Sequence, residues 1–335
     1  MRILVTGTAG FVGFHLARRL LADGHEVVGI DALTDYYDVT LKRARRDQLL
    51  AHPRFRDHVF RLEDAEALQA AAEEAAPHAI VHLAAQAGVR YSLKDPRAYL
   101  NANMVGTFNV IEAARRLSVR HLLFASSSSV YGADETVPFV ETSPVDRPLT
   151  FYAASKKSGE DMTHAYSHLW NLPTTVARFF TVYGPWGRPD MALSLFADAI
   201  LHGRPVTIYG HGEMERDFTY VDDLVEGLVR LLATPPRRDQ PVAGGRDSLS
   251  PVAPWRVVNI GRGQPVLLSD FVTAIERALG RRAVRDLQPI QPGESRITFA
   301  SADLLEALTG FRPSTPLEAG VAAFCEWHTA YYGAR

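Results

Sequence analysis

The stretch Ile3-Leu-Val-Thr-Gly-Thr-Ala-Gly-Phe-Val-Gly13 predicts a strand, a glycine turn and the start of a helix. Its three glycines let the backbone turn tightly and approach a pyrophosphate, and the helix that follows offers free amide groups and a positive dipole end. Their spacing is G-x-x-G-x-x-G rather than G-x-G-x-x-G. A tight turn with no ligand is the other interpretation, and it is the weaker one because the turn opens an alternating α/β pattern.

The next predicted strand, Glu26-Val-Val-Gly-Ile-Asp31, ends in an acid. A carboxylate at this position is typical of a contact with the ribose hydroxyls of an adenosine. Because Ala32 and Leu33 follow, and no arginine is there to receive a 2′-phosphate, the sequence favours NAD over NADP. The other interpretation of Asp31 is a helix or turn cap.

Strand-like and helix-like segments continue to alternate along the first half of the chain. The runs 79–84 and 121–125 are apolar, as expected for strands buried on both faces, 59–62 is a weaker strand, and 174–180 is a further one. This alternation predicts a doubly wound parallel sheet of the Rossmann type. Ligands of such sheets bind at the carboxyl ends of the strands, and four serines, 126–129, follow the strand at 121–125.

From Thr181 onward the chain is dominated by glycine, proline and short elements. We therefore expect an α/β protein with two parts. An NAD-binding domain spans 1–180, and a smaller α/β substrate-binding lobe spans 181–335, with segments near 217–262 returning to the first domain.

Composition excludes several classes of protein. The 335 residues are 47% hydrophobic with a mean hydropathy of -0.08, which allows a sizeable core. With 36 basic and 38 acidic residues the net charge is -2, which gives no general attraction to nucleic acid or to a membrane. We expect no metal, because the single Cys325 cannot form a cysteine zinc cluster by itself. His164 and His168 have a helical zinc spacing, but no glutamate follows the first histidine and no third ligand is apparent in the sequence. We expect a cytoplasmic location, because the sequence shows no leader and no membrane-spanning run.

Tyr152 and Lys156 lie four residues apart in the stretch Thr150-Phe-Tyr-Ala-Ala-Ser-Lys-Lys157. On a helix this spacing puts both side chains on one face, one turn apart. A tyrosine titrates near ~10, and a neighbouring ammonium stabilises its phenolate, so the pair can take a proton from a hydroxyl and return it. Without further context, such a pair is more often a packed ring beside a solvated amine.

The glycine motif, a serine just after the strand at 121–125, and Tyr152-x-x-x-Lys156 together resemble the extended short-chain dehydrogenase/reductase superfamily. Further segments resemble the UDP-glucuronate 4-epimerases along nearly the whole chain. These segments are 34–42, 84–92, 178–192, 216–223, 234–254 and 291–294.

The resemblance implies an isomerase that converts UDP-glucuronic acid to UDP-galacturonic acid while NAD stays bound. Tyr152 would take the proton from the sugar O4 while C4 gives a hydride to NAD, and the hydride would return to the other face of a transient 4-keto intermediate. Lys156 would orient the nicotinamide ribose and lower the pKa of the tyrosine. Ser127 would form a hydrogen bond with the same O4.

The resemblance also implies a cofactor site along the carboxyl edge of the sheet. Its residues are Gly7, Gly10, Phe11, Val12, Gly13, Asp31, Lys42, Leu62, Leu83, Ala84, Ala85, Gln86, Asn103, Tyr152 and Lys156. This chain differs from many relatives beside the adenine, where Arg61 replaces an aspartate.

The 4-keto intermediate is a β-keto acid, which loses carbon dioxide easily, so the sugar carboxylate must be restrained. Arg188, with Thr181, is the candidate clamp because a guanidinium can hold a carboxylate through two hydrogen bonds. The alternative is an arginine that only pairs with Asp190. By resemblance, Arg216 contacts the diphosphate and Glu294 the uridine ribose. The expected substrate-binding residues are Arg90, Ser92, Ser127, Ser128, Tyr152, Thr181, Arg188, Arg216 and Glu294.

Several alternatives remain open. A UDP-xylose synthase (a UDP-glucuronate decarboxylase) or a sugar 4,6-dehydratase usually carries a glutamate where this chain has Ser129. A UDP-glucose or UDP-N-acetylglucosamine 4-epimerase would not require the Arg188 clamp. A non-catalytic NAD-binding sensor is the distant alternative, because the set of Ser127, Tyr152 and Lys156 is intact. The resemblance further implies a homodimer through the helices at 96–117 and 152–170.

Overall fold

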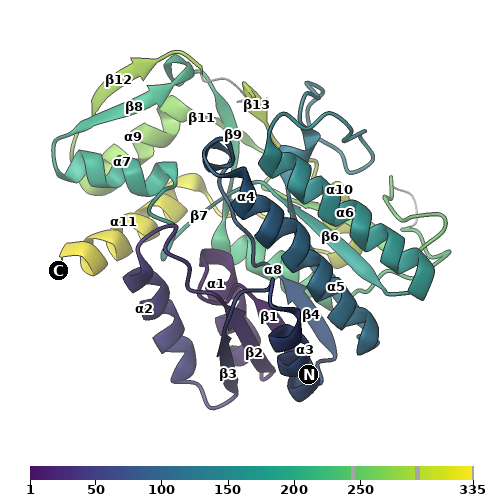
Figure 1. Cartoon of the computed structure of the whole chain (residues 1–335). Helices are drawn as coiled ribbons and strands as arrows, with labels where there is room; N and C mark the ends of the chain where they lie inside the picture. Colours follow the sequence, from purple (N-terminus) through teal and green to yellow (C-terminus); the bar gives the residue numbers. More distant parts are fainter. Residues whose placement is uncertain (243–245, 291–294, 334–335) are drawn as a thin grey trace.

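The centre of the fold is a seven-stranded parallel sheet, seen in a computed structural model that describes residues 1–242, 246–290 and 295–333 (Figure 1). The strand order β10-β6-β5-β4-β1-β2-β3 means that the chain winds outward from β1 in both directions, with parallel pairing throughout. This confirms the predicted Rossmann-type sheet. The strands are β1 Arg2–Thr6, β2 Glu26–Asp31, β3 Phe55–Val59, β4 Ala79–His82, β5 His121–Ser127, β6 Thr174–Phe179 and β10 Trp255–Ile260.

The third strand lies earlier in the chain than the predicted 59–62, so that prediction was wrong. β3 pairs with β2 over its whole length and ends at Val59. The chain then leaves the sheet, because the Asp64 carboxylate accepts a hydrogen bond from the Ala67 amide at 3.0 Å and begins the next helix. The segment 60–63 is therefore free to line a ligand site instead of a strand ladder.

The apolar run at 79–84 is a strand only as far as His82. The amides of Leu83 and Ala84 each donate to the Thr6 hydroxyl at 3.1 Å, so they do not extend the ladder. This turns the end of β4 over the glycine loop that follows β1.

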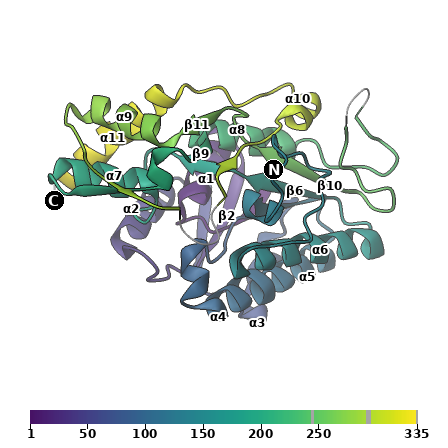
Figure 2. The ribbon, with the colours of Figure 1, turned by 90° about the horizontal axis from the view of Figure 1, so that it is seen from above.

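Helices cover both faces of the sheet, because side chains alternate along each strand. Ile3 and Val5 pack in a core with α1, α8 and α10, and Leu4 packs in a core with α3 and α5. Figure 2 shows α5 and α6 on one side of the sheet and α8 on the other. The helices of these layers are α1 Phe11–Ala22, α2 Val39–Leu50, α3 Ala65–Ala75, α4 Pro96–Tyr99, α5 Gly106–Arg116, α6 Phe151–Trp170, α8 Val221–Leu232 and α10 Asp303–Thr309.

The remaining elements form a smaller group that lies above the central sheet in Figure 1. Strand β9 pairs with β7, β11 and β13, and β8 pairs with β12. Phe218 and Phe271 stack in the core of this group, with ring centroids 4.0 Å apart. Its elements are β7 Thr181–Tyr183, β8 Pro205–Tyr209, β9 Glu215–Tyr220, β11 Pro265–Leu267, β12 Val284–Gln288, β13 Ile297–Thr298, α7 Ala192–Leu201, α9 Leu268–Leu279 and α11 Leu317–Gly333.

The two halves of the sequence interlock, since β10, α8 and α10 come from the second half and pack in the first sheet or on its face. Among the described residues, no helix combines the length and the apolar character needed to cross a bilayer.

Candidate active site

A cavity of about 490 Å³ opens at the carboxyl ends of the central strands, between the sheet and the smaller lobe. Its position is the one expected for a ligand site in a doubly wound sheet. Most of the predicted site residues line it. They are Gly7, Gly10, Phe11, Val12, Gly13, Asp31, Lys42, Leu62, Leu83, Ala84, Ala85, Gln86, Ser127, Ser128, Tyr152, Lys156, Thr181 and Arg188.

Four predicted residues do not belong to the cavity wall, and Glu294 lies outside the described residues. Asn103 stands behind the wall and holds Gln86, accepting from its amide at 2.7 Å and donating to its carbonyl at 3.0 Å. Ser92 is buried and donates to a backbone carbonyl. Arg90 lies 4.7 Å from the centre of the Tyr209 ring, and Arg216 donates to carbonyls of the smaller lobe.

At its three glycine positions, 7, 10 and 13, the loop leaves no room for a side chain. Gly7 has a φ of +80°, and a Cβ on Gly13 would lie 2.0 Å from the Gly7 carbonyl oxygen. Gly10 precedes α1 and supplies no side-chain cap, so the amides of the first helical turn have no side-chain partner there. The loop and helix therefore form an anion site suited to a pyrophosphate.

Asp31 lies at the end of β2, beside this loop. Its two carboxylate oxygens accept hydrogen bonds from the amides of Ala9 at 3.0 Å and Leu33 at 2.8 Å. Each oxygen keeps a lone pair for a further donor, as a ribose diol would provide. Burial raises the pKa of Asp31, and these amides act against the rise. Arg61 is in the wall of the cavity at this end, next to Leu62.

Lys42 places a second charge near the cofactor loop. Its ammonium donates to the Thr34 carbonyl at 2.6 Å and to the Thr34 hydroxyl at 2.9 Å. Burial lowers the pKa of Lys42, while Asp31 favours its charged form. The ammonium is thus held in place on the cavity wall.

Tyr152 and Lys156 lie in the first turns of α6, which begins where the Thr150 hydroxyl accepts from the Ala153 amide at 3.2 Å. Both side chains reach the cavity. Burial raises the pKa of Tyr152, and a hydrogen bond with Ser127 and the positive charge of Arg188 act against that rise. The groups that would stabilise a phenolate are therefore present.

The Lys156 ammonium is held by a hydrogen bond to β5, the strand that also carries Ser127. It donates to the Ala125 carbonyl at 2.9 Å. Burial lowers the pKa of Lys156 to about 8, and Glu160 acts in the opposite direction. At neutral pH the ammonium is thus close to its titration range, which suits a group that assists proton transfer.

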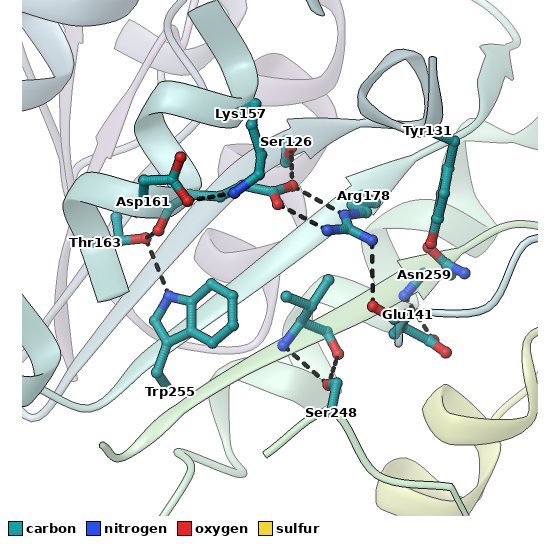
Figure 3. A network of polar contacts seen from close by, with 12 residues as sticks. Ser126, Tyr131, Glu141, Lys157, Asp161, Thr163, Arg178, Ser248, Trp255 and Asn259 are labelled. Carbon is teal, nitrogen blue, oxygen red and sulfur yellow. Dashed lines mark hydrogen bonds and ion pairs between the residues drawn. The ribbon is translucent and has the colours of Figure 1, made fainter. Parts of the chain in front are cut away.

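A buried polar network lies behind these residues (Figure 3). Arg178 donates to both carboxylate oxygens of Glu160, at 2.9 and 2.7 Å, and the Ser126 hydroxyl donates to the same group at 2.5 Å. Because Ser126 precedes Ser127 and Glu160 lies one turn after Lys156, the network joins the end of β5 to α6. It therefore sets the distance between Ser127 and the helix that carries Tyr152 and Lys156.

Glu141 lies at the far end of this network, where it accepts from the Asn259 amide at 2.9 Å. Burial raises the pKa of Glu141 to about 7, despite that hydrogen bond and the charge of Arg178. In the unfolded chain a glutamate has a pKa of about 4.3. The folded state therefore binds this proton more tightly, and the contribution of Glu141 to stability falls as the pH rises from about 4.5 to 7.

We expect Glu141→Gln to flatten this pH dependence, because glutamine keeps the acceptor oxygen without the charge. At pH 8 the variant should be more stable than wild type by at most about 3 kcal/mol, with little difference at pH 5. Urea unfolding at both pH values measures the effect. Glu135→Gln is the control, since Glu135 is an exposed acid of the same loop. Equal differences for both variants at both pH values would contradict a buried, titrating Glu141.

Arg188 faces the cavity and forms an ion pair with Asp190. This pairing is the one given in the sequence analysis as the alternative to a carboxylate clamp. Its Nε donates to Asp190 at 3.0 Å and its Nη2 at 2.5 Å. The Tyr36 hydroxyl donates to the same carboxylate at 3.0 Å. The charge of Arg188 also acts to lower the pKa of Tyr152, so it reaches the Tyr152 hydroxyl.

The sequence pattern of the NAD dependent epimerase/dehydratase family matches residues 3–243 of this chain. The chain belongs to this family. Its dependence on NAD agrees with the cofactor predicted from the glycine turn and Asp31. The glycine loop, the helix N-terminus and the Asp31 carboxylate fit this cofactor.

Individual members of this epimerase/dehydratase family match over the full length of the chain. A probable UDP-glucuronate 4-epimerase of Rhizobium meliloti is 57% identical over 99% of this chain and 98% of its own length. Protein CapI of Staphylococcus aureus is 47% identical over 99% of both. The structure resembles a Bacillus cereus UDP-glucuronic acid 4-epimerase solved with UDP-glucuronic acid and NAD, with a TM-score of 0.88 and 31% identity over 99% of this chain and 100% of that one.

Several tyrosines around the cavity of this chain were missed in the sequence analysis. Tyr36 and Tyr37 line the cavity, in a segment, 35–50, that the sequence indicates only as basic and partly helical. Tyr99 donates to the Gly88 carbonyl and packs edge-on to Tyr152, with centroids 5.9 Å apart. The pair Tyr36-Tyr37 was a detectable signal, since two adjacent aromatics in a charged segment are unusual. Among the described residues, no group of three or more metal-ligating side chains is present.

Proposed function

We propose that this protein interconverts UDP-glucuronic acid and UDP-galacturonic acid by inverting C4, with NAD held in the cavity throughout. The observation that carries the proposal is that the guanidinium of Arg188 shares one cavity with Ser127, Tyr152 and Lys156. A cation beside a proton-transfer pair is suited to a sugar that carries a carboxylate. The full-length similarity to UDP-glucuronate 4-epimerases supports the same substrate.

Bound NAD supplies the acceptor and donor of the hydride at C4 of the sugar. Tyr152 takes the proton of the O4 hydroxyl and later returns it. Lys156 stabilises the phenolate by its positive charge, and Ser127 orients the O4 and the tyrosine by a hydrogen bond. We place the pyrophosphate at the glycine loop and the adenosine ribose at Asp31.

The 4-keto acid formed from this sugar can decompose. The C5–C6 bond breaks, its electron pair passes into the C4 carbonyl to give an enolate, and carbon dioxide leaves. We propose that Arg188 restrains the carboxylate so that this bond stays out of alignment with the carbonyl π system. Thr181 and Ser128, which line the same wall, supply hydrogen bonds to the sugar.

The outer part of the substrate extends toward the smaller lobe in this proposal. Arg216 holds the diphosphate, Arg90 and Ser92 shape the sugar pocket, and Glu294 meets the uridine ribose. Ser129 occupies the position where decarboxylases and 4,6-dehydratases of this scaffold usually carry a glutamate, which favours a simple epimerase. Neutral UDP-sugars would leave Arg188 without a role in binding.

Proton NMR of the purified protein with UDP-glucuronic acid, without added NAD, tests the proposal. A new galacto-configured uronic acid with no pentose signal is the expected result. A pentose product would identify a decarboxylase instead. Conversion of UDP-glucose or UDP-N-acetylglucosamine alone would identify a neutral-sugar epimerase, and no turnover of any UDP-sugar would favour an NAD-binding sensor.

We also propose a cytoplasmic homodimer, formed through α5, α6 and the helical segment 96–105 before α5. This surface exposes Phe108 by 43%, Val105 by 42%, Leu169 by 65% and Trp170 by 48%. Exposed apolar side chains gathered on one face are typical of a protein interface. A dimer would bury them.

The double variant Phe108→Glu, Leu169→Glu should be a monomer at micromolar concentration. Dimerisation would bury the two new carboxylates, and the loss of their hydration costs free energy. Sedimentation velocity measures the change. Val284→Glu is the control, since Val284 is also exposed, by 56%, but lies on β12 in the smaller lobe. A monomeric wild type would contradict the dimer.

A further inference from the structure

Arg45 is a fully buried arginine of α2, lying between the cofactor loop and the loop that carries Arg188. Its Nη1 donates to the Ala9 carbonyl at 2.9 Å, and Ala9 lies inside the glycine loop. Its Nη2 donates to the carbonyls of Trp186 at 2.6 Å and Gly187 at 3.3 Å. One guanidinium therefore links the two loops that would hold the cofactor and the sugar carboxylate.

The backbone just before Arg188 depends on this contact. Trp186 has a φ of 60°, the left-handed region that a bulky side chain rarely adopts. Such a conformation persists only where the surroundings enforce it. The short hydrogen bond from Arg45 to the Trp186 carbonyl is such a restraint. The backbone conformation just before Arg188, and with it the direction of the Arg188 side chain, thus depends on Arg45.

A lysine could not make the same link. The guanidinium is a planar fork with five donors, and here its two terminal nitrogens point to opposite loops. A lysine ammonium is a single point on a flexible stem and reaches one loop at a time. The fork is also steadied by Tyr37, whose hydroxyl accepts from Nη1 at 2.8 Å.

All of these hydrogen bonds end on neutral oxygens. The charge of Arg45 is therefore not used up in a close ion pair with them. It lowers the pKa of Lys42, as the charge of Arg188 does. Four cationic side chains line the cavity, those of Lys42, Arg61, Lys156 and Arg188, and Arg45 lies behind its wall. That arrangement suits a ligand with both a pyrophosphate and a carboxylate.

We propose that Arg45 is a positioning residue that sets the place of Arg188 relative to the cofactor loop, and thereby controls whether the 4-keto acid is epimerised or loses carbon dioxide. This inference rests on the proposed function. It assigns Arg45 no contact with the substrate. Its effect on the product passes through the carbonyls of Trp186 and Gly187.

The test is the product partition of Arg45→Lys with UDP-glucuronic acid, measured by proton NMR as pentose formed per 4-epimer formed. A merely structural role lowers the fraction of active enzyme but leaves this ratio unchanged. We expect the ratio to rise roughly 10- to 100-fold above that of wild type, or above the detection limit where wild type gives no pentose signal, because a misplacement near 1 Å has effects of this size. Arg46→Lys is the matched control, since Arg46 is the next residue of α2 and pairs with Asp57 on β3, away from the cavity.

A pentose ratio for Arg45→Lys equal to wild type would overturn the proposal. A wild type that makes no 4-epimer would overturn the proposed function instead, so the two failures are distinct. If Arg45→Lys does not accumulate as folded protein, Tyr37→Phe removes one acceptor of Arg45 and keeps the ring. A smaller rise in the pentose ratio is then expected, and an unchanged ratio would count against the proposal.

Discussion

Replacing Tyr152 with phenylalanine should lower kcat for C4 epimerisation by roughly 10²- to 10⁴-fold, because positioned proton transfer contributes about that much. The ring would still pack edge-on to Tyr99, with centroids 5.9 Å apart, so folding and NAD retention should be unchanged. The measurement combines turnover by NMR with the NAD content of the purified variant.

Tyr166→Phe is the matched control for this substitution. Tyr166 lies on the same helix, and its hydroxyl donates to Glu112 at 2.6 Å, away from the cavity wall. It should therefore keep its kcat. If Tyr152→Phe stayed within tenfold of wild type while retaining NAD, Tyr152 would not be the acid–base group, and another residue of the cavity would have to take that role.

Arg188→Gln should have the second large effect, on both rate and product. Removing one partner of a desolvated charge pair costs about 2–5 kcal/mol, or roughly 30- to 5,000-fold in kcat/KM for UDP-glucuronic acid. In addition, a pentose should appear, because the carboxylate is no longer restrained. NMR of the product mixture measures both changes. UDP-glucose binding should change far less, since that sugar has no carboxylate.

Asp190→Asn separates the clamp from the alternative that Arg188 only pairs with Asp190. Asp190 holds the guanidinium through two hydrogen bonds, and the Tyr36 hydroxyl also donates to it. If Arg188 binds the substrate, the asparagine variant keeps the cation in the cavity, and its product stays free of pentose. If the ion pair is only structural, the two variants should behave alike, and neither should form pentose.

The main fold could be read from local patterns. The glycine turn, the acid at the end of β2 and the apolar strands at 79–82 and 121–127 appear in the structure close to where the sequence places them. These features are local, since a glycine with positive φ or an unbroken apolar run can be recognised from neighbouring residues alone. The strand predicted at 59–62 was misplaced because the Asp64 cap competes with the strand pattern.

The candidate site was only partly readable. Tyr152 and Lys156 are one helical turn apart in the sequence itself, and a helix cap at Thr150 makes their shared face predictable. Tyr99 and Arg45 were missed because nothing around them in the sequence indicates a site, and Tyr36 was missed although the adjacent pair Tyr36-Tyr37 in a charged segment was a detectable signal. Their roles come from partners that lie far along the chain, such as Asp190 for Tyr36 and Trp186 for Arg45.

Local residue patterns predict the Rossmann-type sheet, the preference for NAD and the one-turn spacing of Tyr152 and Lys156, because each pattern lies within short stretches of the chain. The folded chain shows in addition that Arg188 faces the same cavity as Tyr152 and that Arg45 links its loop to the glycine turn. These contacts join segments separated by more than 30 residues, and in the case of Arg45 and Trp186 by 141. Packing of the whole chain brings such segments together, and no local propensity encodes it.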